Sequence, residues 1–175
     1  MRQEIHSERP ELITVTPSLW NDLRSDILKI ECASFPPSLA DNDKDLQKLA
    51  NSSSGIFLIL TLPSPFRAIG YIAADLLEYF ADIPGIAADP HFGQRDTIYV
   101  ESVAVLPAWR GRGFGTALMR KCIQVAVQKG MHRVTAHVHS GSVIRTGFAI
   151  KAVKSFRDWY GTGNTFDYVE ILMDV

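Results

Sequence analysis

The chain has 175 residues, of which 46% are hydrophobic, and its formal net charge is -1. This length and composition suit one hydrophobic core, so we expect residues 1–175 to form a single domain. The longest apolar runs, such as residues 55–62, are far shorter than a membrane span, and the first residues lack the apolar stretch of a signal peptide. We therefore expect a soluble, cytoplasmic protein with no membrane partner.

Hydrophobic periodicity predicts a mixture of helices and strands along the chain. Residues 12–15 alternate as a short strand, and Thr16-Pro17 then begins a helix that ends at Phe35-Pro36-Pro37. A long loop, 82–97, separates two later strands. The other predicted elements are helices at 41–50 and 116–129 and strands at 56–60, 68–77, 98–106, 133–139, 148–156 and 166–173. This mixed order predicts an α+β fold.

A glycine-rich turn follows the predicted strand at 98–106. Gly111, Gly113 and Gly115 allow a ligand to approach the backbone without meeting a Cβ atom, and the first N–H groups of the next helix attract anions. Gly115 is followed by Thr-Ala, so the turn is not a P-loop. Thr116 stands where a dinucleotide-binding turn has its third glycine. The turn therefore predicts a phosphorylated ligand that is neither a nucleoside triphosphate nor a dinucleotide.

Charge is distributed unevenly between the two parts of the chain. Residues 107–157 contain ten Lys or Arg and no Asp or Glu, whereas residues 1–106 carry eight basic and fifteen acidic side chains. The later part suits a polyanion and the earlier part leans toward cations. The chain has no basic helix, RNA-binding signature or zinc spacing, so we expect no nucleic-acid partner. Cys32 and Cys122 have no Cys or His at metal-ligand spacing, and we expect no metal site.

The same turn also carries a more specific pattern. Arg110, Gly113 and Gly115 fit Arg/Gln-x-x-Gly-x-Gly/Ala, which resembles the acetyl-CoA signature of the GNAT N-acetyltransferase superfamily. The resemblance implies a twisted, mixed but mostly antiparallel sheet of six to seven strands flanked by helices, with acetyl-CoA as the acyl-donor cosubstrate. It also implies that strand backbone pairs with the pantetheine arm and that N–H groups of the turn bind the pyrophosphate. The cofactor-binding residues implied are Val103, Ala104, Val105, Arg110, Gly111, Arg112, Gly113, Phe114, Gly115 and Thr116.

Three residues are candidates for acid–base chemistry in direct acetyl transfer to an amine, which needs a neutral nucleophile and a stabilised oxyanion. Strand alternation predicts one face made of Tyr99, Glu101, Val103 and Val105. Glu101 is the first candidate for the base, since similar segments of small-amine GNAT enzymes carry a Glu there. Tyr99 and His137 form a competing pair, because protein N-terminal acetyltransferases resemble the chain at both positions. A structural carboxylate and simple aromatic packing are the alternative interpretations.

Two aromatic segments favour a peptide or protein N-terminus as the acceptor. Phe35, Pro36 and Pro37 resemble a Phe-Pro segment that lines the acceptor groove of protein N-terminal acetyltransferases, and Tyr160 resembles part of the hairpin that covers it. An N-terminal amine, with a pKa near 8, is also neutral far more often than lysine. Pro-Pro can equally act as a helix stop, and aromatic residues often pack a turn. Polyamines or aminoglycoside-like amines are the alternative acceptors, and the chain is expected to be a monomer or homodimer.

The segment before Gly147 departs from the family pattern. Most GNAT enzymes follow the equivalent strand with Asn-x-x-Ala and a helix ending Tyr-x-x-x-Gly-Phe. Here the Tyr position is Val143, and only seven residues separate His139 from Gly147. The usual general acid is therefore missing, and no residue is assigned to that role. The same departure leaves a non-catalytic acetyl-CoA-binding protein as a further alternative.

Overall fold

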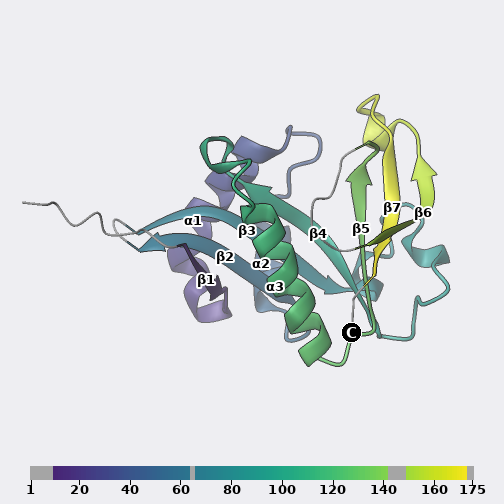
Figure 1. Cartoon of the computed structure of the whole chain (residues 1–175), viewed down its shortest axis with the longest axis horizontal. Helices are drawn as coiled ribbons and strands as arrows, with labels where there is room; N and C mark the ends of the chain where they lie inside the picture. The colour runs from purple at the N-terminus through teal and green to yellow at the C-terminus, as the bar shows by residue number, and fades with distance from the viewer. Residues whose placement is uncertain (1–9, 64–65, 142–148, 173–175) are drawn as a thin grey trace, which may run out of the picture.

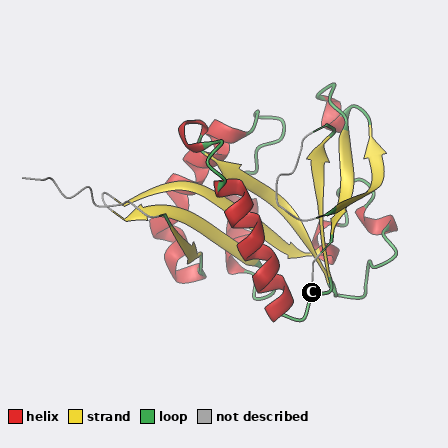
Figure 2. Ribbon diagram, viewed as in Figure 1, coloured by secondary structure: helices red, strands yellow, loops and turns green. Residues whose placement is uncertain are grey.

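The computed structural model describes residues 10–63, 66–141 and 149–172, which form a seven-stranded sheet flanked by helices (Figures 1 and 2). The strands are β1 (Glu11–Thr14), β2 (Ile56–Pro63), β3 (Phe66–Leu76), β4 (Thr97–Val105), β5 (Arg133–His139), β6 (Ile150–Phe156) and β7 (Phe166–Ile171). Their order in the sheet is β1-β2-β3-β4-β5-β7-β6, and every neighbouring pair is antiparallel except β4 and β5. The predicted α+β fold with a mixed, mostly antiparallel sheet is confirmed.

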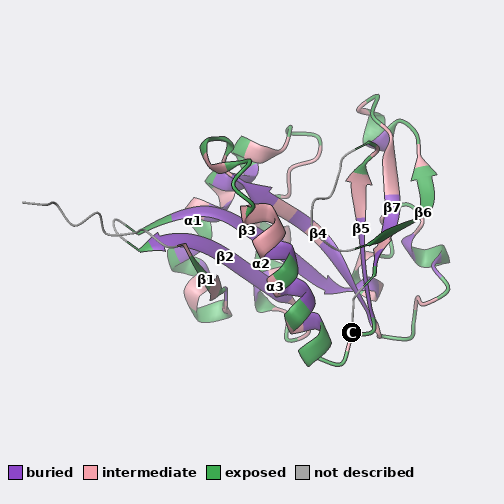
Figure 3. Ribbon diagram, viewed as in Figure 1, coloured by how far each residue is buried: buried purple, intermediate pink, exposed green. Residues whose placement is uncertain are grey.

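Within the described residues, three α-helices cover the two faces of the sheet: α1 (Pro17–Ser34), α2 (Asp43–Asn51) and α3 (Phe114–Gln128). α3 packs against β2, β3 and β4 on one face, while α1 and α2 pack on the other (Figure 1). Strands β2 and β3 are buried along nearly their whole length because both of their faces are covered (Figure 3). Among the helices that the structure describes, none is long and apolar enough to cross a membrane.

Helix α1 follows its sequence signals. Thr16 is the extended N-cap residue and Pro17 occupies the first turn, where its fixed φ suits a helix. Trp20, Leu23, Ile27 and Ile30 recur at helical spacing and are buried. The helix ends at Phe35, whose extended backbone is the conformation that a following proline imposes. The chain after α1 then reaches β4, where Asp41 Oδ2 accepts a hydrogen bond from Ser102 Oγ.

Strands β4 and β5 pair along only part of their length. The parallel ladder joins Thr97–Val100 to Arg133–Ala136. Beyond Val100, β4 continues to pair with β3 as far as Val105, and β5 pairs with β7, while β4 and β5 diverge (Figure 1). The sheet therefore opens between β4 and β5, while the β3–β4 and β5–β7 ladders stay intact.

A β-bulge lies in β4 at the point where it leaves β5. On the partner strand, Ala73 and Ala74 are consecutive, but they pair with Ser102 and Val100 respectively. Glu101 is therefore the extra residue, and it has no partner in the β3 ladder. The bulge places one acidic residue at the mouth of the opening between β4 and β5.

The bulge also changes which side chains share a face. Val100 and Val105 belong to the core under α3, and Val103 packs against it, whereas Tyr99 belongs to a separate cluster with Leu77, Ile86 and Tyr168. The prediction that Tyr99 shares a face with Val103 and Val105 is wrong. Strict alternation assumes a regular strand, and one inserted residue shifts its period by one position.

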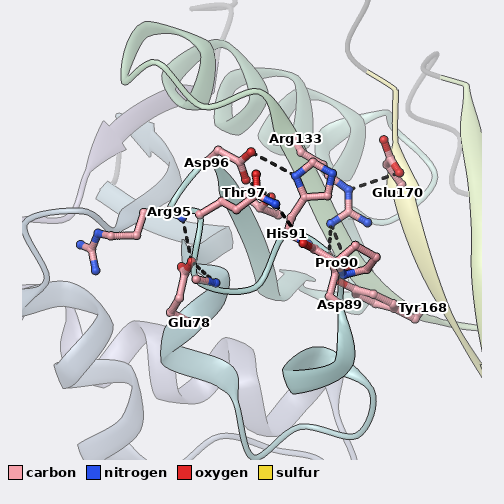
Figure 4. A network of polar contacts seen from close by, with 12 residues as sticks. Glu78, Asp89, Pro90, His91, Arg95, Asp96, Thr97, Arg133, Tyr168 and Glu170 are labelled. Carbon is pink, nitrogen blue, oxygen red and sulfur yellow. Dashed lines mark hydrogen bonds and ion pairs between the residues drawn. The ribbon is translucent and has the colours of Figure 1, made fainter.

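The long loop between β3 and β4 is fastened to the sheet by a buried polar network (Figure 4). Arg133 Nη1 donates to both carboxylate oxygens of Asp89 at 2.9 Å, and Tyr168 Oη donates to Asp89 Oδ2 at 2.8 Å. Burial alone raises the pKa of Asp89, but hydrogen bonds from His91 N–H, Tyr168 and Arg133 outweigh it and lower that pKa. Glu170 contacts Arg133 Nε at 3.2 Å. This part of the chain is thereby held against β5 and β7.

Candidate active site

A cleft of about 640 Å³ lies where β4 and β5 separate. β4 contributes Val103 and Val105 to its wall, the glycine-rich turn contributes Gly113 and Gly115, and β5 contributes His137. The cleft thus runs from the start of α3 to the bulge in β4. It joins an apolar strand edge to a helix N-terminus, which suits a ligand with an apolar arm and an anionic end.

The turn has the backbone that a phosphate site requires. Gly111 and Gly113 have φ values of 76° and 82°, which only glycine adopts readily. Gly113 is the N-cap of α3, and the first-turn N–H groups of a helix have no acceptor within it. A Cβ atom on Gly115 would meet no other atom within 4 Å and would project into open space. Arg110 Nε donates to the Val105 carbonyl at 2.9 Å and ties the turn to β4.

Most of the predicted cofactor residues line this cleft. Ala104 and Arg112 do not: Ala104 packs in the core beneath α1, and the Arg112 guanidinium lies 4.8 Å from the centroid of the Trp109 ring. The prediction for Ala104 concerned its backbone, which the packing of its side chain does not test. The predicted residues that line the cleft are Val103, Val105, Arg110, Gly111, Gly113, Phe114, Gly115 and Thr116.

A second cavity, of about 560 Å³, lies on the other side of the bulge. Leu49, Phe80 and Ile83 form its apolar wall. The acidic residues that line it, apart from Glu101, are Asp41, Asp45, Asp75 and Asp82. None of these four aspartates was a candidate from sequence. The excess of acidic residues before residue 107 was a signal, but it does not indicate that residues as far apart as Asp41 and Asp82 line one cavity.

Glu101 lines both the cleft and the second cavity. Its Oε2 atom is buried and has no hydrogen-bond partner among the described residues. Burial raises the pKa of Glu101 to about 8, and the nearby carboxylates of Asp41, Glu31 and Asp45 add to the rise. A carboxyl group with such a pKa exists in both protonation states near neutral pH, as a proton acceptor requires.

Tyr99 and His137 contact each other behind the cleft. Tyr99 Oη lies 3.0 Å from His137 Nδ1, and the imidazole stacks against Trp159 and Tyr168 with centroid distances of 4.4 and 4.8 Å. Burial lowers the pKa of His137 to about 4 and raises that of Tyr99 well above 10, so both groups are neutral at pH 7. His137 lines the cleft, whereas Tyr99 is 3% exposed and lines neither cavity.

The predicted acceptor residues lie around the bulge to different degrees. Phe35 lines the cleft from the end of α1, while Pro36 and Pro37 are exposed beside it. Tyr160, in the connection between β6 and β7, is 56% exposed. Burial raises the pKa of Tyr160, and the carboxylates of Glu101 and Asp82 add to this rise, which places its phenol within their electrostatic reach.

The segment that departs from the GNAT pattern gives no structural answer about a general acid. Val143 and Gly147 lie outside the described residues. On the β5 side of these residues, Ser140 donates its backbone N–H to the Thr165 carbonyl at 2.8 Å. The absence of a tyrosine from this position therefore stays an observation on the sequence.

Solved structures of other proteins share this fold over nearly the whole chain. The NatC complex bound to Gag peptide and CoA matches with a TM-score of 0.76 and 14% identity over 94% of this chain and 99% of that one. The ribosomal-protein-S18-alanine N-acetyltransferase of Escherichia coli matches with a TM-score of 0.68 and 13% identity, covering 94% and 93%. Arabidopsis thaliana NAA60 in complex with acetyl-CoA matches with a TM-score of 0.69 and 17% identity, covering 94% and 100%.

Comparison of the sequence with protein families agrees with these likenesses. No curated protein matches the chain significantly. The family described as "Acetyltransferase (GNAT) family" matches residues 20–149, which run from α1 past the glycine-rich turn to the last residue before β6. The match covers well over half of the sequence, including Glu101 and the glycine-rich turn. The chain therefore belongs to the GNAT acetyltransferase family.

Proposed function

We propose that the chain transfers the acetyl group of acetyl-CoA directly to a primary amine at the N-terminus of a peptide or protein, with Glu101 as the general base. The observation that carries the proposal is the position of Glu101, which lines both cavities at the bulge of β4. One cavity has the features of a donor site, and the other is open to a cationic acceptor. A proton acceptor between them is positioned for the reacting amine.

The donor cleft fits acetyl-CoA. The N–H groups at the start of α3 and the αL glycines Gly111 and Gly113 would hold the pyrophosphate, and the β4 edge at Val103 and Val105 would lie along the pantetheine arm. The open space above Gly115, which a Cβ atom would occupy, leaves room for the ligand. When bound, acetyl-CoA supplies a thioester carbonyl as the electrophile. The protein must still orient the amine and receive its proton.

Glu101 is better suited than His137 to receive that proton. A base works best when its pKa lies near the operating pH, and the pKa of Glu101 is about 8, whereas that of His137 is about 4. The proton would be held on Oε2, the oxygen without a partner among the described residues. Tyr99 and His137 act as positioning residues, because their contact joins β4 to β5 where the ladder between these strands ends.

An N-terminal amine suits the acceptor side for two reasons. Its pKa near 8 leaves a useful neutral fraction at physiological pH, so a base such as Glu101 suffices. The exposed Tyr160 and the Phe35-Pro36-Pro37 segment provide aromatic and apolar contacts near Glu101. The peptide bound in the NatC structure and the ribosomal-protein alanine named for the E. coli enzyme support this acceptor class.

The test is a panel of peptides with free N-termini, the same peptides with blocked N-termini, and small amines. Release of CoA with free peptides and not with blocked ones is the expected result. The acidic second cavity favours polyamines as the second candidate, and turnover with polyamines alone would replace peptides by small amines. Binding of acetyl-CoA without turnover on any amine would instead identify a non-catalytic binding protein.

A further inference from the structure

The second cavity combines an apolar wall with carboxylates that have few cationic partners. Five of its eleven lining residues are acidic, and Lys48 is the one basic residue among them. Lys48 Nζ contacts Asp45 Oδ1 at 2.9 Å. Asp41, Asp75, Asp82 and Glu101 form no ion pair within the described part of the chain. The cavity thus has an excess of negative charge beside the proposed base.

Two buried carboxyl groups, those of Asp75 and Glu101, distinguish this cavity from a solvated acidic surface. Asp75 is only 2% exposed, and its Oδ1 accepts hydrogen bonds from Ser54 Oγ at 2.6 Å and from the Leu76 N–H at 2.7 Å. These bonds leave Oδ2 for another donor. The enclosed Oε2 of Glu101 likewise has no partner among the described residues. An enclosed carboxylate oxygen is costly without a donor, so a cationic ligand is the natural complement.

We propose that this cavity binds a second positive charge of the acceptor, so that the preferred substrate is a primary amine that also carries an ammonium group. This inference rests on the proposed function and defines its substrate class: a peptide N-terminus followed by lysine. The lysine methylenes would contact Leu49, Phe80 and Ile83, and its ammonium group would contact the aspartates. At pH 8 lysine remains protonated, while an N-terminal amine is about half neutral, so one substrate supplies both the nucleophile and the anchor.

The bound ammonium group should also change the pKa of the proposed base, Glu101. Asp41 and Asp45 are among the like charges that raise the pKa of Glu101, and a bound ammonium group would offset them. The pH profile of kcat, which reports the substrate-bound enzyme, should therefore lie at lower pH than that of kcat/KM. A peptide without the second charge should show a smaller displacement between the two profiles.

The experiment compares two peptides that differ only in having Lys or Gln at the second position. CoA release at low ionic strength should give a kcat/KM about tenfold higher for the Lys peptide, because complementary charge strengthens binding in a partly buried site. The double variant Asp45→Asn/Asp82→Asn should reduce this preference to about twofold or less. The single variant Asp82→Asn, which changes an exposed loop residue, should reduce the preference for the Lys peptide only in part. Asp22→Asn, on the exposed side of α1, is the matched control and should keep the preference.

The outcomes separate this inference from the proposed function. Equal kcat/KM for the two peptides would overturn the cation-binding cavity while leaving N-terminal acetylation supported. Turnover of spermidine but of neither peptide would support the cavity and overturn the peptide acceptor. If no amine is turned over, the proposed function fails, and calorimetry with spermidine then decides about the cavity: absence of binding overturns it, and binding that the double variant abolishes supports it.

Discussion

The Glu101→Gln substitution tests the proposed base through the slope of a pH profile. Below pH 8, kcat/KM of the wild type depends on two ionisations, since Glu101 must be ionised and the acceptor amine must be neutral. Both groups have a pKa of about 8. Each therefore contributes a tenfold change per pH unit, and log(kcat/KM) between pH 6 and 7 should rise with a slope of about two. In Glu101→Gln only the amine titrates, and the slope should be about one.

The size of the defect should also depend on pH. A positioned general base contributes about 10²–10⁴-fold, so near pH 9, where Glu101 is mostly ionised, the variant should be about 1000-fold slower than the wild type. With a pKa of about 8, only about one Glu101 in a hundred is ionised at pH 6. The difference between the enzymes should therefore shrink to about tenfold at that pH.

The assay measures acetylated peptide by chromatography at saturating acetyl-CoA from pH 6 to 9. Glu11→Gln, an exposed residue of edge strand β1, is the matched control and should retain the slope of about two. A slope of two in Glu101→Gln would refute the reasoning, because the second ionisation would then belong to another group. Urea unfolding gives an independent readout. The raised pKa of Glu101 stabilises the fold below pH 4.5, and this contribution is lost as pH rises through about 8, a dependence that the variant should lack.

Three further substitutions test the cleft and its supports. Gly115→Ala should weaken CoA binding, measured by calorimetry, by about tenfold or more, because the added Cβ would occupy space in the cleft. The free energy of unfolding should not fall, because that Cβ meets no protein atom. Unchanged CoA affinity would contradict the binding of acetyl-CoA in this cleft. Tyr71→Phe should cost about 1–3 kcal/mol in urea unfolding, since it removes a hydrogen bond from the fully buried Glu31; a neutral effect would show that another donor replaces it. Arg133→Met should cost about 3–5 kcal/mol at pH 7 by leaving the buried Asp89 without its ion-pair partner. That loss should diminish as pH falls below 3.8 through the lowered pKa of Asp89, and a constant difference would contradict it.

Local sequence signals were sufficient for most of the fold and for the glycine-rich turn that lines the cleft. Proline and glycine mark the ends of α1 and the start of α3, and the predicted strand at 133–139 has the same bounds in the structure. The glycine pattern identified the family, whose membership also confirms the expectation of an acetyltransferase with acetyl-CoA as cosubstrate. Helix ends, strand bounds and the glycine pattern depend on residues that are close together in the sequence, so a single sequence is enough to predict them.

The lining of the second cavity depends on contacts between distant segments and was not predicted from the sequence. Asp41 follows α1, Asp75 lies near the end of β3 and Asp82 lies in the next loop, so no spacing along the chain indicates that they line one cavity. Arg133 and Asp89, 44 positions apart, likewise meet only because β5 lies beside β4. Counting charges showed that the first part of the chain is acidic, but it did not indicate where the acidic side chains lie in the fold.

The bulge explains why Glu101 lines both cavities. In a regular strand, Glu101 would share the face of Tyr99, which packs in a closed aromatic cluster. The extra residue leaves Glu101 outside the β3 ladder, and it returns Val103 and Val105 to the α3 side, where they line the cleft. Ser102 then points to the opposite face, where its Oγ donates to Asp41 Oδ2 at 2.9 Å. A single insertion in β4 therefore places the donor cleft, the proposed base and the acidic cavity next to one another.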